Sequence, residues 1–312
     1  MSHPSLVIVG SIGIDHIETP KLKKENLLGG SVSYACAAAS FFSPPGMVGV
    51  VGEDFPDKFM ELYHSFDVDL QGLQRAEGQT FSWTGVYEEN MDNRRTLETV
   101  LGVFESFEPT LPDAYLSAPF VFLGNMHPGL QLHVLSQIES PKFVLADTMD
   151  LWINITRSEL LDVIRKVNML TLNESEARLL TDSHNLLDAA KALLKMGPEF
   201  VLIKKGEHGS MLFSETGMFI QPAFPVENVE DPTGAGDTFA GALMGYLTRT
   251  NACDEAEIRR AMVHGSVVAS FGVQAFSLEA LEALTTPHIQ KRVDGLLSMM
   301  HVDLPCPHTV AT

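Results

Sequence analysis

Short, continuous runs of apolar residues alternate along the chain with longer segments in which apolar residues recur at helical spacing. Continuous runs of this length are typical of parallel strands buried on both faces, and spacing of three to four residues is typical of amphipathic helices. We therefore expect strands at 5–10, 47–52, 120–125, 143–148, 169–173 and 200–205. Helices are expected at 34–42, 57–66, 235–247, 256–270 and 278–297. This alternation predicts an α/β fold with a parallel sheet covered on both faces.

The pattern changes between residues 79 and 103, where polar and apolar residues alternate around an acidic turn. Strict alternation predicts a β-hairpin with one covered face, unlike the fully buried strands on either side. We expect one domain over residues 1–300, with a β lid formed by about 14–20 and 79–104. The C-terminal segment, 301–312, is expected to be loose.

The stretch "DPTGAGDTFAGALMGYL", residues 231–247, places three small residues where a helix begins. A helix start offers unpaired amides and a partial positive charge, so Gly234, Ala235 and Gly236 suit an anion. Asp237 would repel a phosphate if it only had to bind one. Its position makes sense for a base that takes a proton from a group attacking that phosphate.

Polar residues follow several of the expected strands. They are Asp15, Asn125, His127, Asp147, Asn173 and Glu176. Because ligands bind at the carboxyl ends of parallel strands, these side chains indicate a site along one edge of the sheet. Each residue taken alone is equally well explained as a turn or a helix cap.

The net charge of −19 over 312 residues argues against nucleic acid or an anionic membrane as a partner, since both favour basic surfaces. It does not exclude a nucleotide, whose phosphates can be met by backbone amides and a metal ion. The three cysteines, Cys36, Cys253 and Cys306, fit neither a disulfide framework nor a zinc site. The apolar run at 6–14 is too short and too rich in glycine for a signal peptide or a membrane span, so we expect a cytoplasmic protein.

The motifs together resemble the ribokinase-like, or phosphofructokinase-B type, carbohydrate and nucleoside kinases over about residues 5–297. The most specific match is "DPTGAGDTFAGAL". The others, in the order found in the family, are "GSIGIDHI", Gly29–Gly30, "VVGEDFPDKF", "NESE" and "KKGEHGSML". The resemblance implies a three-layer α/β sandwich with a mainly parallel central sheet and a small β lid.

The resemblance also implies an ATP-dependent kinase that phosphorylates a hydroxyl group and uses Mg²⁺. In it, Asp237 is the base and Gly234, Ala235 and Gly236 form the anion hole. Glu176 acts on the metal through water. The implied substrate-binding residues are Asp15, Gly29, Gly30, Ser33 and Tyr34. The implied nucleotide-binding residues are Asn173, Lys205, Gly206, Gly209, Thr233 and His264.

Several assignments have alternatives. Asn173 and Glu176 could simply begin a helix, and His264 could be a packed helix histidine. Lys204 and Lys205 could lie near the nucleotide or be solvated at a strand end. Arg94 and Arg95 could reach an anionic substrate or lie in a solvated turn. Phe81 and Trp83 could stack on a substrate, cover the lid or pair two lids in a homodimer.

The chain departs from the family pattern at two places. Tyr34 stands where relatives often carry an Asn that contacts sugar hydroxyls. The segment "SFGVQAFS" replaces the usual Thr-Arg-x-Gly-Ala, which leaves activation by K⁺ open. A sugar is the first expected substrate and a nucleoside the second. A non-catalytic ligand sensor and a nicotinamide dehydrogenase are rival functions, and the latter lacks a Gly-x-Gly-x-x-Gly motif.

Overall fold

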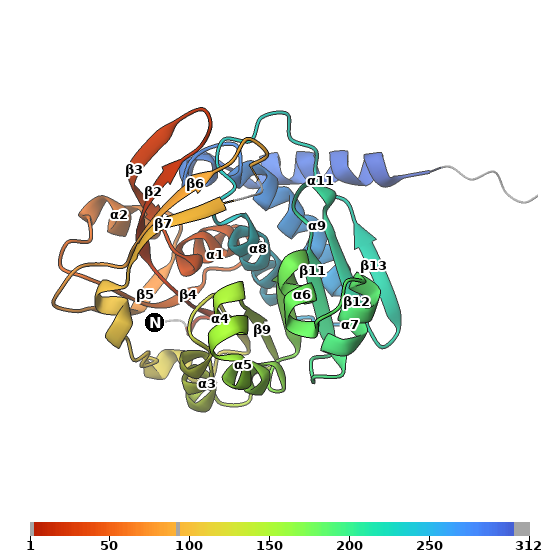
Figure 1. Cartoon of the computed structure of the whole chain (residues 1–312), viewed down its shortest axis with the longest axis horizontal. Coiled ribbons are helices and arrows are strands. Elements are labelled where there is room, and N and C mark those ends of the chain that lie inside the picture. Colours follow the sequence, from red (N-terminus) through yellow and green to blue (C-terminus); the bar gives the residue numbers. More distant parts are fainter. Residues whose placement is uncertain (1–2, 92–93, 303–312) are drawn as a thin grey trace, which may run out of the picture.

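The computed structural model describes residues 3–91 and 94–302. A nine-stranded sheet runs through the centre in the order β13-β12-β11-β10-β9-β8-β1-β4-β5 (Figure 1). The seven strands from β11 to β5 pair in parallel, and β12 and β13 add an antiparallel edge. The strands are β1 (Leu6–Val9), β4 (Gly46–Val51), β5 (Asp69–Arg75), β8 (Phe120–Leu123), β9 (Phe143–Asp147), β10 (Met169–Asn173), β11 (Phe200–Lys204), β12 (Ser210–Ser214) and β13 (Gly217–Gln221).

Helices cover both faces of this sheet, so alternate residues of one strand enter different cores. In β1, Leu6 and Ile8 join the core beneath α1, α8 and α9, whereas Val7 and Val9 join the core beneath α3 and α5. Burial on both faces explains why the strands read as continuous apolar runs. The helices are α1 (Ser31–Ser40), α2 (Asp57–Ser65), α3 (Pro128–Gln137), α4 (Asp150–Ile155), α5 (Arg157–Ile164), α6 (Glu174–Thr181), α7 (Leu186–Leu194), α8 (Ala235–Thr250), α9 (Glu255–Gly272), α10 (Glu279–Glu282) and α11 (Thr286–Met300), with short 3₁₀ turns at Gly102–Ser106, Asp113–Tyr115 and Gly206–His208.

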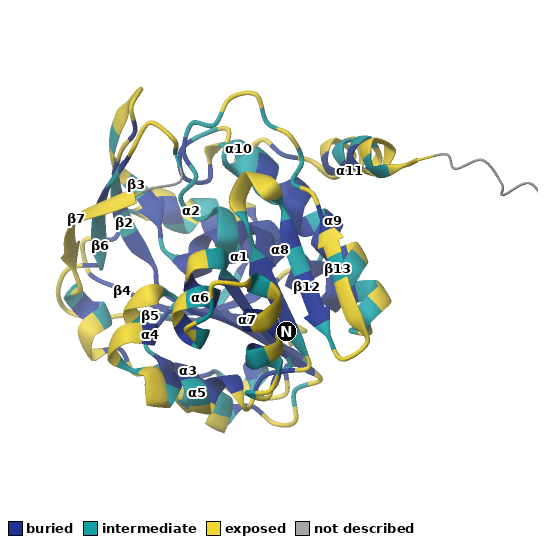
Figure 2. Cartoon of the chain, turned by 45° about the vertical axis from the view of Figure 1, so that its right-hand side comes forward, coloured by how far each residue is buried: buried dark blue, intermediate teal, exposed yellow. Residues whose placement is uncertain are grey.

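A second, four-stranded sheet lies against one end of the main body, in the order β3-β2-β6-β7 (Figure 1). Its strands are β2 (Gly13–Glu18), β3 (Lys23–Gly29), β6 (Ser82–Tyr87) and β7 (Arg94–Val100). We call this sheet the lid. β3 was not among the expected lid segments. The expected covered face is found on β6, but every residue of β7 is exposed (Figure 2).

At the C-terminal end, one expectation differs from the structure and another is not tested by it. The single helix expected at 278–297 is two helices, α10 and α11, because Pro287 in the first turn of α11 cannot continue a preceding helix. The loose segment expected at 301–312 lies, beyond Val302, outside the described residues. Within the described residues, no helix is long and apolar enough to cross a membrane.

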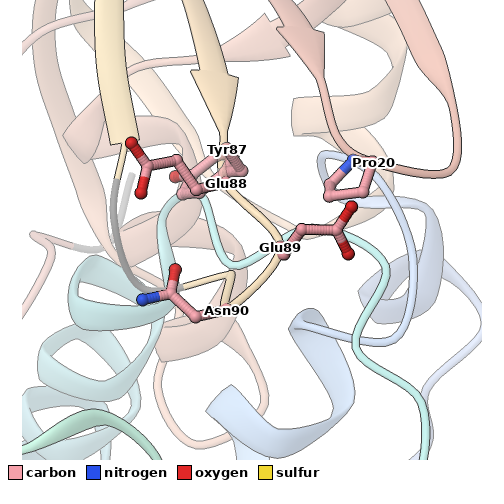
Figure 3. A pocket seen from close by; sticks show the side chains of 5 residues that line it. All are labelled: Pro20, Tyr87, Glu88, Glu89 and Asn90. Carbon is pink, nitrogen blue, oxygen red and sulfur yellow. The ribbon is translucent and has the colours of Figure 1, made fainter.

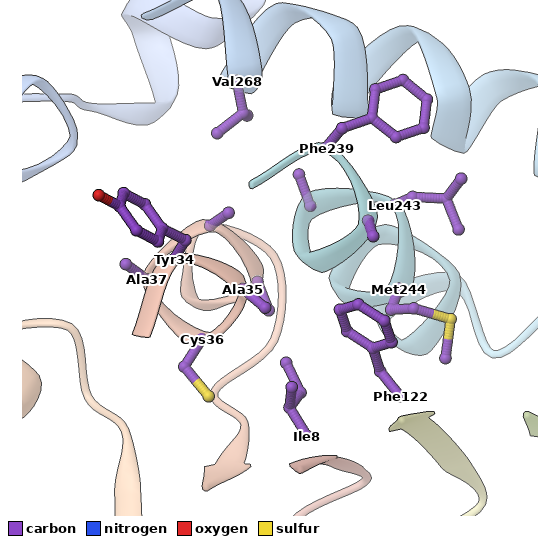
Figure 4. Close-up of a cluster of buried hydrophobic side chains, with 14 of the residues drawn as sticks. Ile8, Tyr34, Ala35, Cys36, Ala37, Phe122, Phe239, Leu243, Met244 and Val268 are labelled. Carbon is purple, nitrogen blue, oxygen red and sulfur yellow. The ribbon is translucent and has the colours of Figure 1, made fainter. Parts of the chain in front are cut away.

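Close packing of α1 against α8 aligns the two helix starts that matter for function (Figure 4). A Cβ atom on Gly241 would lie 2.2 Å from the carbonyl oxygen of Ala35, and one on Gly245 would lie 2.6 Å from that of Ala39. Only glycine allows backbones to approach this closely. The glycine turn before α1 and the glycine turn before α8 are therefore held side by side.

Candidate active site

Helix α8 begins at an open glycine turn. Gly234 is its N-cap residue, with a φ of 72° in the left-handed region that favours glycine. Within the described part of the chain, no hydrogen-bond acceptor is recorded for the amides of Gly234 and Gly236, whereas the amide of Ala235 donates to the Pro232 carbonyl at 3.2 Å. At least two amides of the predicted anion hole are therefore available, next to the positive end of a 16-residue helix.

The ring of Tyr34 covers this turn from the α1 side. A Cβ atom on Gly234 would lie 2.3 Å from Cγ of Tyr34, so the ring is in contact with the glycine backbone. Tyr34 is 3% exposed, and its hydroxyl points away from the hydrophobic cluster without a hydrogen-bond partner among the described residues (Figure 4). Its electrostatic neighbours include Asp15 and Asp237. Tyr34 thus lies between the predicted substrate-binding and catalytic residues.

Asp237 lies in the first turn of α8, half-buried beside the open amides. Burial, and then the negative charge of Asp147, raise the pKa of the Asp237 carboxyl to about 7, although Lys204 and Arg94 act in the opposite direction. A carboxyl group with a pKa near the working pH is well suited to accept a proton and release it again.

Lys204, at the end of β11, brings a positive charge into the site. Its Nζ donates to Oδ2 of Asp147 at 2.8 Å, and its side chain is only 17% exposed. The same nitrogen is 3.0 Å from the position that a Cβ atom on Gly236 would occupy. The Asp147–Lys204 ion pair therefore borders the anion turn directly.

Asn173 and Glu176 begin α6 at the end of the neighbouring strand β10. The Asn173 side chain accepts from the Glu176 amide at 2.9 Å, and the Glu176 carboxylate accepts from the Asn173 amide at 2.7 Å. Burial, and then the nearby Asp147, raise the pKa of Glu176 to about 7. Asn173 and Glu176 do form a capping box, as the alternative of a simple helix start implies. Glu176 in addition lies near the Asp147 carboxylate.

Two neighbouring carboxylates that repel each other suit a bound cation. Among the described residues, no group of three His, Cys, Asp or Glu side chains could hold a metal ion directly. Mg²⁺ commonly keeps several of its waters and binds through one or two carboxylates. The residues present therefore fit Mg²⁺ held largely through water at Glu176.

Asp15 lies on the lid strand β2 and not directly after β1, and it faces the glycine pair before α1. It is 3% exposed, and a Cβ atom on Gly29 would lie 2.0 Å from its Oδ2 atom, so the carboxylate rests on the Gly29 backbone. Burial, followed by the negative charge of Asp231, raises the pKa of Asp15 to about 8. Gly30 is the N-cap residue of α1 and continues the same turn.

The Ser33 side chain points into the interior of the protein. It is fully buried, its hydroxyl donates to the Gly29 carbonyl at 2.7 Å, and it shares a second hydrogen bond of 2.7 Å with the Tyr63 hydroxyl. The prediction that Ser33 contacts substrate is therefore wrong for this conformation, because its hydrogen-bonding capacity is used inside the protein. Its role is to hold the Gly29–Gly30 turn in place.

The lid closes over the site through Tyr87. The Tyr87 hydroxyl is 3.0 Å from the hydroxyl of Thr233, so the end of β6 touches the loop that leads into the anion turn. Tyr87 also lines an open cavity of about 610 Å³ with Pro20, Glu88, Glu89 and Asn90 (Figure 3). Two acids in the wall make this cavity a poor site for a triphosphate.

Arg94, which is exposed, and the partly buried Trp83 lie near each other on the lid. Arg94 pairs with Tyr87 across the β6–β7 ladder, and its charge lowers the pKa values of both Asp15 and Asp237. The Trp83 ring lies near the Arg94 guanidinium and packs against the small cluster formed by Ile17, Tyr87 and Phe276. Arg94 thus lies on a strand and not in a turn, and its charge acts on two acids of the site. Of the roles considered for Trp83, covering the apolar side of the lid is the one that its packing supports.

Of the other predicted nucleotide-binding residues, three lie near the site and one does not. Lys205, Gly206 and Gly209 form the turn that follows Lys204, with a hydrogen bond of 2.8 Å from the Lys205 amide to the Gly209 carbonyl. His264 instead stacks on Tyr246, with ring centroids 4.4 Å apart. Tyr246 is eleven residues beyond the start of α8, or roughly 17 Å along the helix axis. His264 is therefore not brought together with the anion turn, which favours the packed-histidine alternative.

The sequence indicated Asp147 as a polar strand end and Lys204, together with Lys205, as a lysine that could lie near the nucleotide, but it did not assign either residue to the centre of the site. The signal that could have found them is the parallel register, which pairs Asn173 with Lys204 and Thr171 with Asp147. Strand ends that share one register level also share one edge of the sheet. Lys204 was therefore the better choice than Lys205 for the centre of the site.

Comparisons with known proteins identify the family of this chain. The pfkB family of carbohydrate kinases matches residues 4–283. A cytidine kinase of Thermococcus kodakarensis is 30% identical over 258 residues, which cover 80% of this chain and 91% of that protein.

Solved structures confirm the predicted fold class. A nucleoside kinase of Burkholderia thailandensis in complex with inosine has a TM-score of 0.76 at 19% identity, covering 94% of this chain and 99% of that chain. A putative ribokinase II of E. coli in complex with ATP and Mg²⁺ has a TM-score of 0.74 at 17% identity, covering 95% and 100%. The nearly complete family match and the similarity to the cytidine kinase show that this chain belongs to the pfkB family of carbohydrate kinases.

Proposed function

We propose that this protein transfers the γ-phosphate of ATP to a hydroxyl group of a small polyol-type acceptor, with Asp237 as the base. The observation that carries the proposal is the position of the Asp237 carboxyl, in the first turn of α8 beside the open amides of Gly234 and Gly236. A pKa of about 7 makes this group able to take the acceptor proton at neutral pH. The adjacent amides would stabilise the charge on the transferring group.

The nucleotide would lie along the carboxyl ends of β10 and β11. We assign its phosphates to the α8 turn and its contacts with the chain to Asn173, Thr233 and the Lys205–Gly209 turn. Mg²⁺, which would neutralise phosphate charge, would be held through water at Glu176. A solved structure of the same fold contains ATP and Mg²⁺, which supports this assignment.

The acceptor would lie between the lid and the Gly29–Gly30 turn. Asp15 would accept hydrogen bonds from acceptor hydroxyls, and Gly29 gives it the room to do so. We place a nucleoside ahead of a free sugar, the reverse of the order expected from the sequence. The 30% identity to a cytidine kinase supports this order.

The test is an ADP-release assay over nucleosides, sugars, polyols and sugar phosphates, with and without K⁺. We expect turnover with at least one nucleoside or sugar, and loss of turnover by orders of magnitude in Asp237→Asn while ATP still binds. Retained turnover in Asp237→Asn would refute the base assignment. Absence of ATP turnover across the whole panel would favour a non-catalytic ligand sensor.

We further propose that the lid edge pairs two copies of the chain. Leu97, Val100 and Leu101 on and after β7 are between 36% and 54% exposed. An exposed edge strand offers unpaired backbone groups as well as these apolar side chains. Sedimentation of the wild type and of Leu97→Lys tests this, since a dimer in the first and a monomer in the second are expected.

A further inference from the structure

Lys204 is a largely buried cation, 17% exposed, at the open end of α8. Every Cα–Cβ bond in a helix tilts toward the helix N-terminus, so the space where a Cβ atom on Gly236 would lie is on the N-terminal side of the first turn. The Lys204 ammonium lies 3.0 Å from that point. It therefore faces the same space that the open amides of the turn face.

The surroundings of Lys204 keep it charged and fixed in direction. Asp147 accepts one hydrogen bond from the ammonium at 2.8 Å, and Glu176 and Asp237 also favour its charged form. The other oxygen of Asp147 accepts from the Thr148 amide at 2.9 Å, which fixes the carboxylate itself. An ammonium group has three donors, so two remain for other acceptors.

We propose that Lys204 is a catalytic residue whose ammonium donates a hydrogen bond to the phosphoryl group held at the α8 turn, with Asp147 as the residue that positions it. This inference rests on the proposed phosphotransfer. Phosphoryl transfer depends on positioning and charge neutralisation, and a full charge adds to the half charge of a helix start. A purely structural role, in which Lys204 only separates three acids, is the competing explanation.

Nucleotide affinity distinguishes the two roles, because the contact requires the third phosphate. We would measure the dissociation constants of Mg²⁺·AMP-PNP and Mg²⁺·ADP by calorimetry for wild type, Lys204→Met, Lys204→Arg and Lys204→Met/Asp147→Asn. In Lys204→Met we expect AMP-PNP to bind about 10- to 100-fold more weakly, as for loss of a hydrogen bond between charged groups, and ADP to change less than about threefold. Lys204→Arg should recover part of the difference, because the charge is kept.

The double variant guards against loss of folding. Lys204→Met alone leaves Asp147 buried without its partner, which is destabilising, whereas Lys204→Met/Asp147→Asn removes both charges. We expect the double variant to regain thermal stability but not the preference for AMP-PNP over ADP. Lys191→Met is the matched control, since it removes an exposed lysine that is paired with Asp188 on α7.

Equal weakening of both nucleotides, no weakening, or recovery of the preference in the double variant would overturn the role of Lys204. Wild-type protein that binds neither nucleotide would instead refute the phosphotransfer proposal itself. If the wild type turns over ATP and Lys204→Met still prefers AMP-PNP over ADP as the wild type does, only the inference about Lys204 is overturned.

Discussion

Replacement of Asp15 by Asn should make the protein more stable at pH 8 and weaken acceptor binding. Burial raises the pKa of Asp15 from 3.8 to about 8. Between these two pH values, Asp15 is therefore protonated in the folded protein and ionised in the unfolded chain. The contribution of Asp15 to the stability of the wild type therefore falls as pH rises from 4 to 8. At about 1.4 kcal/mol for each pH unit, the cost between pH 5 and pH 8 is about 4 kcal/mol. Asn has nearly the same shape and carries no charge at either pH.

Urea unfolding of the wild type and of Asp15→Asn at pH 5, 6.5 and 8 measures this cost. The free energy of unfolding of the variant, relative to that of the wild type, should rise by up to about 4 kcal/mol between pH 5 and pH 8. Asp294→Asn, which removes an exposed carboxylate on α11, controls for the general effect of lost charge. A difference between wild type and Asp15→Asn that stays constant over this range would refute the assignment of Asp15 as a buried, protonated acid.

Three further outcomes follow from the geometry. The kcat/KM for the acceptor should fall about tenfold per pH unit below pH 7, since Asp237 must lose its proton to act as the base. Asp147→Asn should move this acidic limb of the pH-rate profile to lower pH, because it removes a charge that repels the Asp237 carboxylate. A limb moved to higher pH in Asp147→Asn would contradict this. Gly234→Ala should lower thermal stability and turnover, since the new methyl group would meet the Tyr34 ring at 2.3 Å. Gly217 also has a positive φ, of 141°, but a methyl group there meets no atom within 4 Å, so Gly217→Ala measures the cost of backbone strain without such a contact and should cost less. Equal losses in melting temperature would argue against the contact. Ser33→Ala should cost about 1–3 kcal/mol in urea unfolding, because it removes two buried hydrogen bonds, and an unchanged free energy of unfolding would contradict this buried role.

The elements that the sequence predicted well are those whose burial is uniform. β1 and β4 are buried at every position, so their apolar runs identify them without knowledge of their neighbours. β3 was missed because its first four residues, "KKEN", are mostly exposed and its apolar residues come only at the end. The break between α10 and α11 was signalled by Pro287, but the apolar spacing on both sides of it resembles one helix.

The parts of the site that the sequence predicted are those where the backbone itself acts. The glycine turn before α8 needs no side-chain orientation to be recognised. The roles of Ser33, His264 and Lys204 depend instead on which way a side chain points, and neither spacing nor composition contains that information. Ser33 points inward to Tyr63, His264 points to Tyr246, and Lys204 points into the site while Lys205 continues into the next turn.

Under the proposed function, the contact between Tyr34 and Gly234 would couple the choice of acceptor to the binding of the phosphate group. A smaller residue at position 34 would open space for a different acceptor, but it would also remove the surface against which the α8 turn rests. Mutations at the two positions should therefore be epistatic: a change of acceptor specificity introduced at position 34 alone would carry a loss of turnover that only a second substitution near residue 234 could restore.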